Sequence, residues 1–268
     1  MPSSRHPVVR ITIIDPVVLD GQVLIDPAPE IPGAVIERRS LAFGTASVES
    51  RWDDAFAAPG IIDAAIRAEA AGADAVVVNC MEDPAVDAAR EVVRIPVVGP
   101  AEAGMHLALC VADRFSILTT EAADIPIVRE MVERHRLEHR CASIRAAGLP
   151  VLGIGADEND TLRRLTAAAH AAVEDGAAAL VLGCTLFASL TDRLAAELPG
   201  IPVIDPLSAA LHHALTLVRL GVSHSAVGYP APDAKPISWP ADDVHFGPAA
   251  AEGSALAAGG PHSEGSVR

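Results

Sequence analysis

Short apolar runs alternate along most of the chain with segments whose apolar residues recur every three or four positions. The runs are rich in Val, Ile and Leu and end at Gly, Pro or Asp, which is typical of buried parallel strands. The periodic segments predict amphipathic helices. We expect strands at residues 8–14, 34–43, 75–79, 97–98, 115–119 and 149–154, and helices at residues 54–71, 84–93, 101–111, 126–136, 161–174 and 207–220. This alternation predicts an α/β fold built on parallel sheets.

Two parts of the chain repeat each other. Residues 72–80 and residues 176–184 each begin with Gly-Ala, continue as an apolar run and end in a cysteine. A second matched pair of blocks, each beginning Ile-Pro-Val, follows these stretches at nearly the same spacing. The repeat predicts two similar lobes, each a parallel sheet flanked by helices, related by internal duplication. We assign residues 1–105 plus 207–228 to the first lobe, 106–206 to the second lobe, and 229–268 to a C-terminal extension with a disordered end.

The composition limits the kinds of partner that the protein binds. The chain has 268 residues, with 20 basic and 35 acidic side chains and a formal charge of −15. Because nucleic acids and anionic membranes bind clustered Lys and Arg, we expect neither as a partner. No apolar run approaches the roughly 18 residues that cross a bilayer, and four cysteines in so long a chain do not form a disulfide scaffold. We expect a cytoplasmic homo-oligomer with reduced thiols that binds a small molecule.

The repeated cysteines, Cys80 and Cys184, are the candidates for chemistry. Each follows a predicted parallel strand, at the edge where open α/β sheets bind ligands. Each also precedes a predicted helix start, whose N–H groups are expected to lower the thiol pKa. Two such thiols facing one cavity can act as an acid–base pair, one removing a proton from carbon and the other delivering one to the opposite face. Packing and a redox disulfide are the alternatives for this pair, and packing is the expectation for Cys110 and Cys141.

No other motif predicts a metal or a cofactor. The ten histidines form no spacing that would complete a metal site. Gly153 and Gly155 lack the third glycine of a dinucleotide-binding loop, and the chain has no Gly-x-Ser-x-Gly sequence. We therefore expect neither a metal nor a cofactor.

At this point the sequence resembles a known family. The block from Cys80 to Glu91 is similar to the Cys-x-x-Asp-Pro-x-x-x-Ala-Ala-Arg-Glu segment of hydantoin and allantoin racemases. Further similar segments are Gly44–Ser50, Pro96–Gly99, Glu102-Ala103, Phe115–Thr120 and Leu182–Cys184. The resemblance covers residues 8–225 and implies membership of the aspartate/glutamate racemase superfamily. Its members have two similar α/β lobes, with a cysteine from each lobe in an active site between them.

The resemblance implies roles for particular residues. Cys80 and Cys184 correspond to the two acid–base thiols. Thr119 and Thr120 match a loop that binds the polar edge of the substrate, and Thr185 matches the threonine that helps to hold the α-carboxylate in amino-acid racemases. The expected substrate-binding residues are Asp15, Ser47, Asn79, Met81, Thr119, Thr120 and Thr185.

The chain departs from the family pattern at three places. The first strand ends in Asp15-Pro-Val where relatives have Asn-Pro-Asn, and Met81-Glu82 stands where relatives commonly have Phe-Gly. Residues 121–124 lack an arginine that is often found there. The extra carboxylates, Asp15 and Glu82, would disfavour an anionic substrate unless they are paired, and would oppose thiolate formation.

These observations predict a cofactor-independent racemase or epimerase that acts at a carbon next to a carbonyl, with a 5-substituted hydantoin-like ring as substrate. Three alternatives stay open. The Gly183-Cys184-Thr185 sequence also fits an amino-acid racemase of the Asp/Glu type. A maleate-type cis–trans isomerase would use one cysteine as nucleophile and the other as acid. In another class, the chain would be a non-catalytic, two-lobed small-molecule binding protein.

Overall fold

The computed structural model describes residues 8–18, 30–233 and 235. Nearly all of the predicted C-terminal extension, and most of the loop expected between the first two strands, lie outside the described residues. Among the described residues, none of the helices is both long and apolar enough to cross a membrane.

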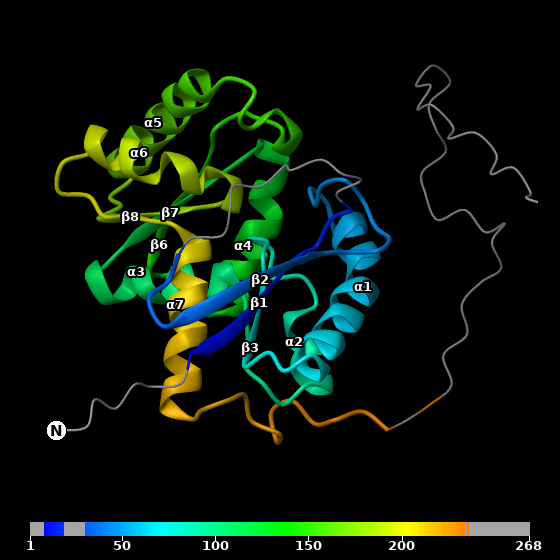
Figure 1. Cartoon of the computed structure of the whole chain (residues 1–268). Coiled ribbons are helices and arrows are strands. Elements are labelled where there is room, and N and C mark those ends of the chain that lie inside the picture. The colour runs from blue at the N-terminus through cyan, green and yellow to red at the C-terminus, as the bar shows by residue number, and fades with distance from the viewer. Residues whose placement is uncertain (1–7, 19–29, 234, 236–268) are drawn as a thin grey trace, which may run out of the picture. The chain divides into compact units, whose positions relative to one another are not determined.

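Two four-stranded parallel sheets form the framework, and they repeat one arrangement (Figure 1). The first sheet has the order β2-β1-β3-β4 and the second the order β6-β5-β7-β8, so equivalent strands occupy equivalent places. All pairings are parallel. The strands are β1 (Val9–Asp15), β2 (Ala34–Ser40), β3 (Ala75–Val78), β4 (Val97–Val98), β5 (Phe115–Thr119), β6 (Cys141–Ala146), β7 (Ala179–Leu182) and β8 (Val203–Ile204). The predicted fold class, an α/β protein with two similar parallel sheets, is confirmed.

Helices cover the sheets and connect them to each other. They are α1 (Arg51–Ala70), α2 (Val86–Val92), α3 (Pro100–Val111), α4 (Ile125–Arg134), α5 (Glu158–Glu174), α6 (Thr191–Glu197) and α7 (Pro206–Leu220). Three short 3-10 helices are η1 (Ala122–Asp124), η2 (Val151–Gly153) and η3 (Thr185–Leu190). Helix α7 packs on the strands of the first sheet and α3 on those of the second. The two helices also pack on each other, so their side chains join the two sheets through one apolar core.

The first long helix begins earlier than expected. Its N-cap is Ser50, whose hydroxyl oxygen accepts the backbone N–H of Asp53. The acidic residues therefore lie in the first turn, where the helix dipole favours negative charge. The helix ends before Gly72, which adopts a left-handed conformation (φ 86°) that favours glycine.

The expected helix start at Asp83-Pro84 is wrong. Helix α2 begins at Val86, after two residues with positive φ, Asp83 and Ala85. The carboxylate of Asp83 instead accepts the N–H groups of Ala101 and Glu102, both at 2.9 Å, at the start of α3. Gly99 leaves room for this contact, because a Cβ atom there would lie 2.2 Å from the Asp83 carboxyl carbon. The aspartate therefore caps a helix distant from it in sequence.

The strand expected at residues 149–154 is also wrong. One of the two edge strands of the second sheet is β6, and it begins at Cys141. Its residues alternate little in polarity and are mostly half-buried, as suits an edge strand that is covered incompletely. The more apolar sequence that resembled a strand forms η2 instead.

Candidate active site

The two repeated cysteines meet at one small cavity. Strand β3 ends at Val78, two residues before Cys80, and strand β7 ends at Leu182, two residues before Cys184. Both cysteines line a cavity of about 100 Å³, together with residues that follow strands of both sheets. Eight of the nine expected site residues line it, namely Ser47, Asn79, Cys80, Met81, Thr119, Thr120, Cys184 and Thr185. Asp15 does not.

Gly183 allows the second cysteine to lie close to the neighbouring strand. Its N–H donates to the carbonyl of Leu118 at 2.7 Å. A Cβ atom on Gly183 would lie 2.6 Å from that carbonyl oxygen and 2.8 Å from the Cα of Thr119. Because these neighbours are backbone atoms, no side chain can move aside. Gly183 thus brings Cys184 against the end of β5.

The expected lowering of the thiol pKa values is wrong for the cavity in this state. Burial raises the pKa of Cys80 well above its usual value, and the negative charge of Glu82 raises it further. Burial also raises the pKa of Cys184 to about 12. The N–H groups of Glu82 and Leu186 do lower these values, as expected at a turn or a helix start. Their effect is smaller than the cost of removing a thiolate from water.

The pair is coupled electrostatically. A negative charge on Cys184 raises the pKa of Cys80, so ionisation of one thiol opposes ionisation of the other. Two groups that interact in this way favour the state with one thiolate and one thiol over the state with two thiolates. That singly ionised state is the one that an acid–base pair requires.

Asp124, which is not among the site residues expected from the sequence, holds the threonine loop. Its carboxylate accepts the backbone N–H of Glu121 at 2.7 Å and the hydroxyl protons of Thr120 and Thr119, the latter at 3.4 Å. The signal was a reciprocal capping pattern, in which Glu121 and Asp124 each bind the backbone of the other. Because the hydroxyl protons are directed at Asp124, the threonines offer oxygen lone pairs to the cavity. In this arrangement the two hydroxyl oxygens can accept hydrogen bonds from a ligand.

The hydroxyl proton of Ser47 is likewise used in a hydrogen bond within the protein. Its hydroxyl donates to a carboxylate oxygen of Glu49, and the other oxygen of Glu49 accepts the N–H of Val151 at 3.5 Å. Ser47 therefore also presents an acceptor oxygen to the cavity. The contact to Val151 ties this loop of the first lobe to the second lobe.

Asp15 is paired outside the cavity. It is 1% exposed, and Arg38 on the neighbouring strand donates to both of its carboxylate oxygens, at 3.0 and 2.7 Å. The amide nitrogen of Asn79 donates to the same carboxylate at 2.8 Å. Of the two extra carboxylates, Asp15 is therefore compensated by a cation.

Glu82 is the extra carboxylate that faces the cavity. Burial raises its pKa to about 7, and the negative charges of Asp54, Asp124 and Asp53 act in the same direction, while Arg51 lowers it. Among the described residues, its Oε2 atom is buried and accepts no hydrogen bond. The cavity therefore has an acidic end next to Cys80.

The cavity lining contains no Lys, Arg or His among the residues that the structure describes. Within the same part of the chain, no three His, Cys, Asp or Glu side chains are grouped so that they could hold a metal ion. The hydroxyl protons of Ser47, Thr119 and Thr120 are used by carboxylates, which leaves these oxygens as acceptors for a ligand. Such a lining suits a neutral ligand that carries N–H groups, because each N–H can pair with an acceptor that is otherwise unsatisfied.

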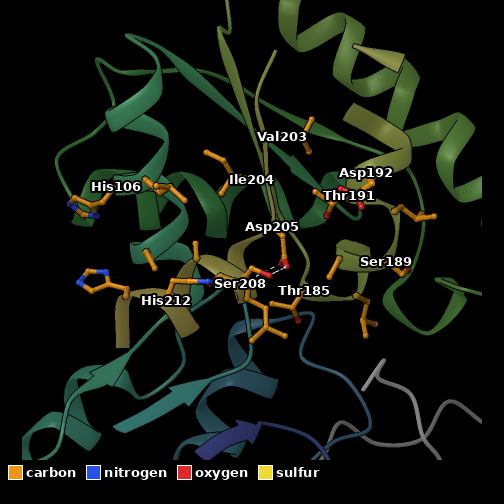
Figure 2. Close-up of a pocket in the computed structure, with 18 of the residues that line it drawn as sticks. His106, Thr185, Ser189, Thr191, Asp192, Val203, Ile204, Asp205, Ser208 and His212 are labelled. Atoms are coloured by element: carbon orange, nitrogen blue, oxygen red, sulfur yellow. Dashed lines mark hydrogen bonds between the residues drawn. The ribbon is translucent and has the colours of Figure 1, made fainter. Parts of the chain in front are cut away.

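A larger cavity, of about 1170 Å³, lies between α3, α7, η3 and β8 (Figure 2). Figure 2 shows Asp205 paired with Ser208 there and the rings of His106 and His212 at one side. Neither Cys80 nor Cys184 lines it, and the exposed Cys110 does. The smaller cavity is therefore the candidate active site.

Comparison with known proteins agrees with this architecture. A hydantoin racemase from Rhizobium meliloti is 39% identical over 183 residues, which are 68% of this chain and 76% of the relative. The structure of an allantoin racemase from Klebsiella pneumoniae matches with a TM-score of 0.79 and 33% identity, covering 86% of this chain and 96% of that one. A glutamate racemase from Bacillus anthracis, with a TM-score of 0.56 and 16% identity over 81% of this chain and 84% of its own, shares the fold.

The predicted family is confirmed by a match over most of the chain. Residues 28–214 fit the sequence pattern described as Asp/Glu/Hydantoin racemase. This segment contains both cysteines, the threonine loop and most of both sheets. The chain belongs to the Asp/Glu/Hydantoin racemase family.

Proposed function

We propose that this protein racemises or epimerises a neutral, hydantoin-like ring at the carbon next to its carbonyl, with Cys80 and Cys184 as base and acid. The observation that carries the proposal is the meeting of two thiols, from equivalent positions of two similar sheets, at one small cavity. Packing alone does not require a cysteine at both positions. A reaction that moves a proton from one face of a carbon to the other requires one group on each face.

The proton balance of the reaction is simple. One sulfur, as thiolate, takes the proton from the ring carbon and becomes a thiol, which leaves an enolate. The other sulfur, as thiol, donates its proton to the opposite face and becomes a thiolate. The reverse reaction exchanges these roles, and proton exchange with solvent restores the starting state. The N–H groups of Glu82 and Leu186 stabilise whichever sulfur carries the charge.

The raised thiol pKa values fit this chemistry. A thiolate that is costly to form is also a strong base, and a carbon acid next to one carbonyl is weak. The small ionised fraction at neutral pH lowers the rate, while the higher basicity of each thiolate raises it. In the occupied site, the bound substrate displaces water and supplies hydrogen-bond donors, so it also affects the balance between the ionised fraction of each thiol and its basicity.

The charge of the cavity supports a neutral substrate over a free amino acid. An α-carboxylate requires a cation or several directed donors, and the described lining offers Glu82 and acceptor oxygens in their place. A hydantoin-like ring is uncharged and carries N–H groups that match these acceptors. The relatives named hydantoin racemase and allantoin racemase support the same substrate class.

Proton NMR in D2O tests the proposal. Wild-type protein is mixed with hydantoins, allantoin and free amino acids, and loss of the signal of the proton on the reacting carbon is followed. We expect exchange on a ring compound, with its loss in both Cys80→Ser and Cys184→Ser. Cys110→Ser and Cys141→Ser serve as matched controls, because Cys110 is exposed on α3 and Cys141 begins an edge strand. These two variants should exchange at the wild-type rate.

Other outcomes identify the alternatives. Full exchange in either of the first two variants would exclude the two-thiol mechanism. Exchange on amino acids alone would indicate an amino-acid racemase, and a covalent adduct on one cysteine, detected by mass, would indicate a cis–trans isomerase. Binding of a ring compound by calorimetry without any exchange would indicate a binding protein.

A further inference from the structure

Three adjacent strands carry a chain of hydrogen bonds that ends at the candidate active site. Arg38 lies on β2, Asp15 ends β1, and Asn79 follows β3, in the order in which these strands pair. The guanidinium of Arg38 donates to both carboxylate oxygens of Asp15, at 3.0 and 2.7 Å. The side-chain nitrogen of Asn79 donates to one of the same oxygens at 2.8 Å. The backbone N–H of Asn79 donates to the carbonyl of Ile14 at 2.8 Å. This bond also fixes the backbone from which the Asn79 side chain extends.

This chain of bonds determines which way the Asn79 amide points. A carboxylate that pairs with a guanidinium can only accept hydrogen bonds, so the amide must turn its NH2 group towards Asp15. The amide oxygen then lies on the other side of the planar group. If Asp15 were an asparagine, as in the Asn-Pro-Asn pattern, either orientation of Asn79 would be possible.

The amide oxygen has no partner in the described part of the chain. Asn79 is 5% exposed, and its Oδ1 atom is buried without a hydrogen bond there. Asn79 lines the cavity that holds both thiols, while Asp15 does not. The nitrogen is used by Asp15, so the oxygen is the amide atom that is left to bind a ligand in the cavity. A buried acceptor without a donor costs free energy, which a ligand N–H would recover.

We propose that Arg38, acting through Asp15, is a positioning residue that holds the Asn79 amide oxygen toward the cavity, where it accepts a ring N–H of the substrate. This inference rests on the proposed function. It makes Asn79 a specificity-determining residue, because a ring that lacks the N–H leaves the amide oxygen unpaired. Since Asn79 directly precedes Cys80 in the chain, the same bond would also orient the reacting carbon towards the thiol.

The test combines variants with modified substrates. The kcat/KM for exchange in D2O is measured with 5-methylhydantoin and with its two N-methyl derivatives, one for each ring nitrogen. The variants are Asn79→Leu, Arg38→Met and Asp15→Asn, and Arg10→Met is the matched control. Arg10 lies on β1, like Asp15, and forms an ion pair with Glu37 of β2. That ion pair is exposed and is not connected to Asn79. Thermal unfolding of each variant shows whether it is folded at the assay temperature.

We expect the wild type to favour the parent compound over at least one N-methyl derivative by about tenfold or more, the factor that corresponds to one hydrogen bond of this kind. Asn79→Leu should remove this preference by slowing the parent while leaving that derivative nearly unchanged. Arg38→Met and Asp15→Asn should reduce the preference, and Arg10→Met should keep it. A merely structural role of Arg38 would slow all compounds by the same factor.

The opposite results would overturn the inference. One such result is that the wild type processes all three compounds at equal rates. The other is that folded Asn79→Leu, Arg38→Met and Asp15→Asn proteins keep the wild-type preference for the parent compound. If the parent exchanges under either of these results, the proposed function stands and only the inference fails. If the wild type exchanges no ring compound at all, the proposed function fails, and the inference fails with it.

Discussion

The carboxylate of Glu82 raises the pKa of the Cys80 thiol, which precedes it by two residues. Both residues line the same small cavity. The pKa of Glu82 is itself raised to about 7, mainly by burial. As the pH rises through this value, Glu82 becomes negative and Cys80 becomes harder to ionise. The pKa of Cys80 is therefore lower beside a neutral Glu82 than beside a charged Glu82.

Replacement Glu82→Gln should lower the pKa of Cys80, because it removes the second largest cause of the increase. At about pH 8, where Glu82 is mostly ionised in the wild type, the variant should carry more Cys80 thiolate. Alkylation by iodoacetamide, followed by mass spectrometry of the peptide that contains Cys80, should be several-fold faster than in the wild type. Cys184 is an internal control, because Asp124 and Glu49 are the charges that raise its pKa. An unchanged Cys80 rate would show that Glu82 does not act on this thiol.

Replacement Gly183→Ala should separate the ends of β5 and β7. The new methyl group would lie 2.6 Å from the carbonyl oxygen of Leu118, and the backbone there can yield only if the strands move apart. We expect a loss of about 1–3 kcal/mol in the free energy of unfolding, measured with urea, and a large loss of exchange activity. Gly228→Ala is the matched control, because its added carbon would be 3.8 Å from the nearest atoms. Wild-type stability of Gly183→Ala would contradict the close approach.

Asp83 should make the protein less stable as the pH rises. Burial raises its pKa to about 7, against the lowering effect of the N–H groups of Glu102 and Ala101. The unfolded chain has a lower value, near 3.9, so between these values the folded state binds more protons than the unfolded state. Stability from this group is therefore full below about pH 4 and is lost as the pH rises to about 7. Glu82 contributes in the same direction.

The variant Asp83→Asn tests this linkage, since it cannot ionise. It loses one of two helix-capping acceptors and should cost about 1 kcal/mol at about pH 5. Its free energy of unfolding should then fall less steeply than that of the wild type between about pH 5 and pH 8, so that the difference shrinks or reverses. Urea denaturation across this range measures both slopes. Parallel pH profiles would show that Asp83 keeps an ordinary pKa in the folded protein.

The sequence by itself determined the α/β architecture and the equivalent positions of Cys80 and Cys184 after two strands. Strand and helix periodicity are local properties, so they predicted the alternation of elements and the α/β class. The repeat of Gly-Ala, apolar run and cysteine placed Cys80 and Cys184 at equivalent strand ends, because duplicated units keep equivalent geometry. The places where this reasoning failed were those with an atypical local pattern, such as the polar edge strand β6.

Only the tertiary structure decided the electrostatics and the orientation of polar groups. The direction of the thiol pKa shifts depends on how much water reaches the sulfurs, which the packing of both lobes sets. The partners of Asp83 and Asp15 lie on other elements, at Ala101 and Arg38, so no local pattern could identify them. The pairing of Asn79 with Asp15, on another strand, likewise decides that the amide oxygen of Asn79 is the atom left without a partner among the described residues. Burial and pairing arise when separate elements meet in space, and this is why a linear pattern does not contain them.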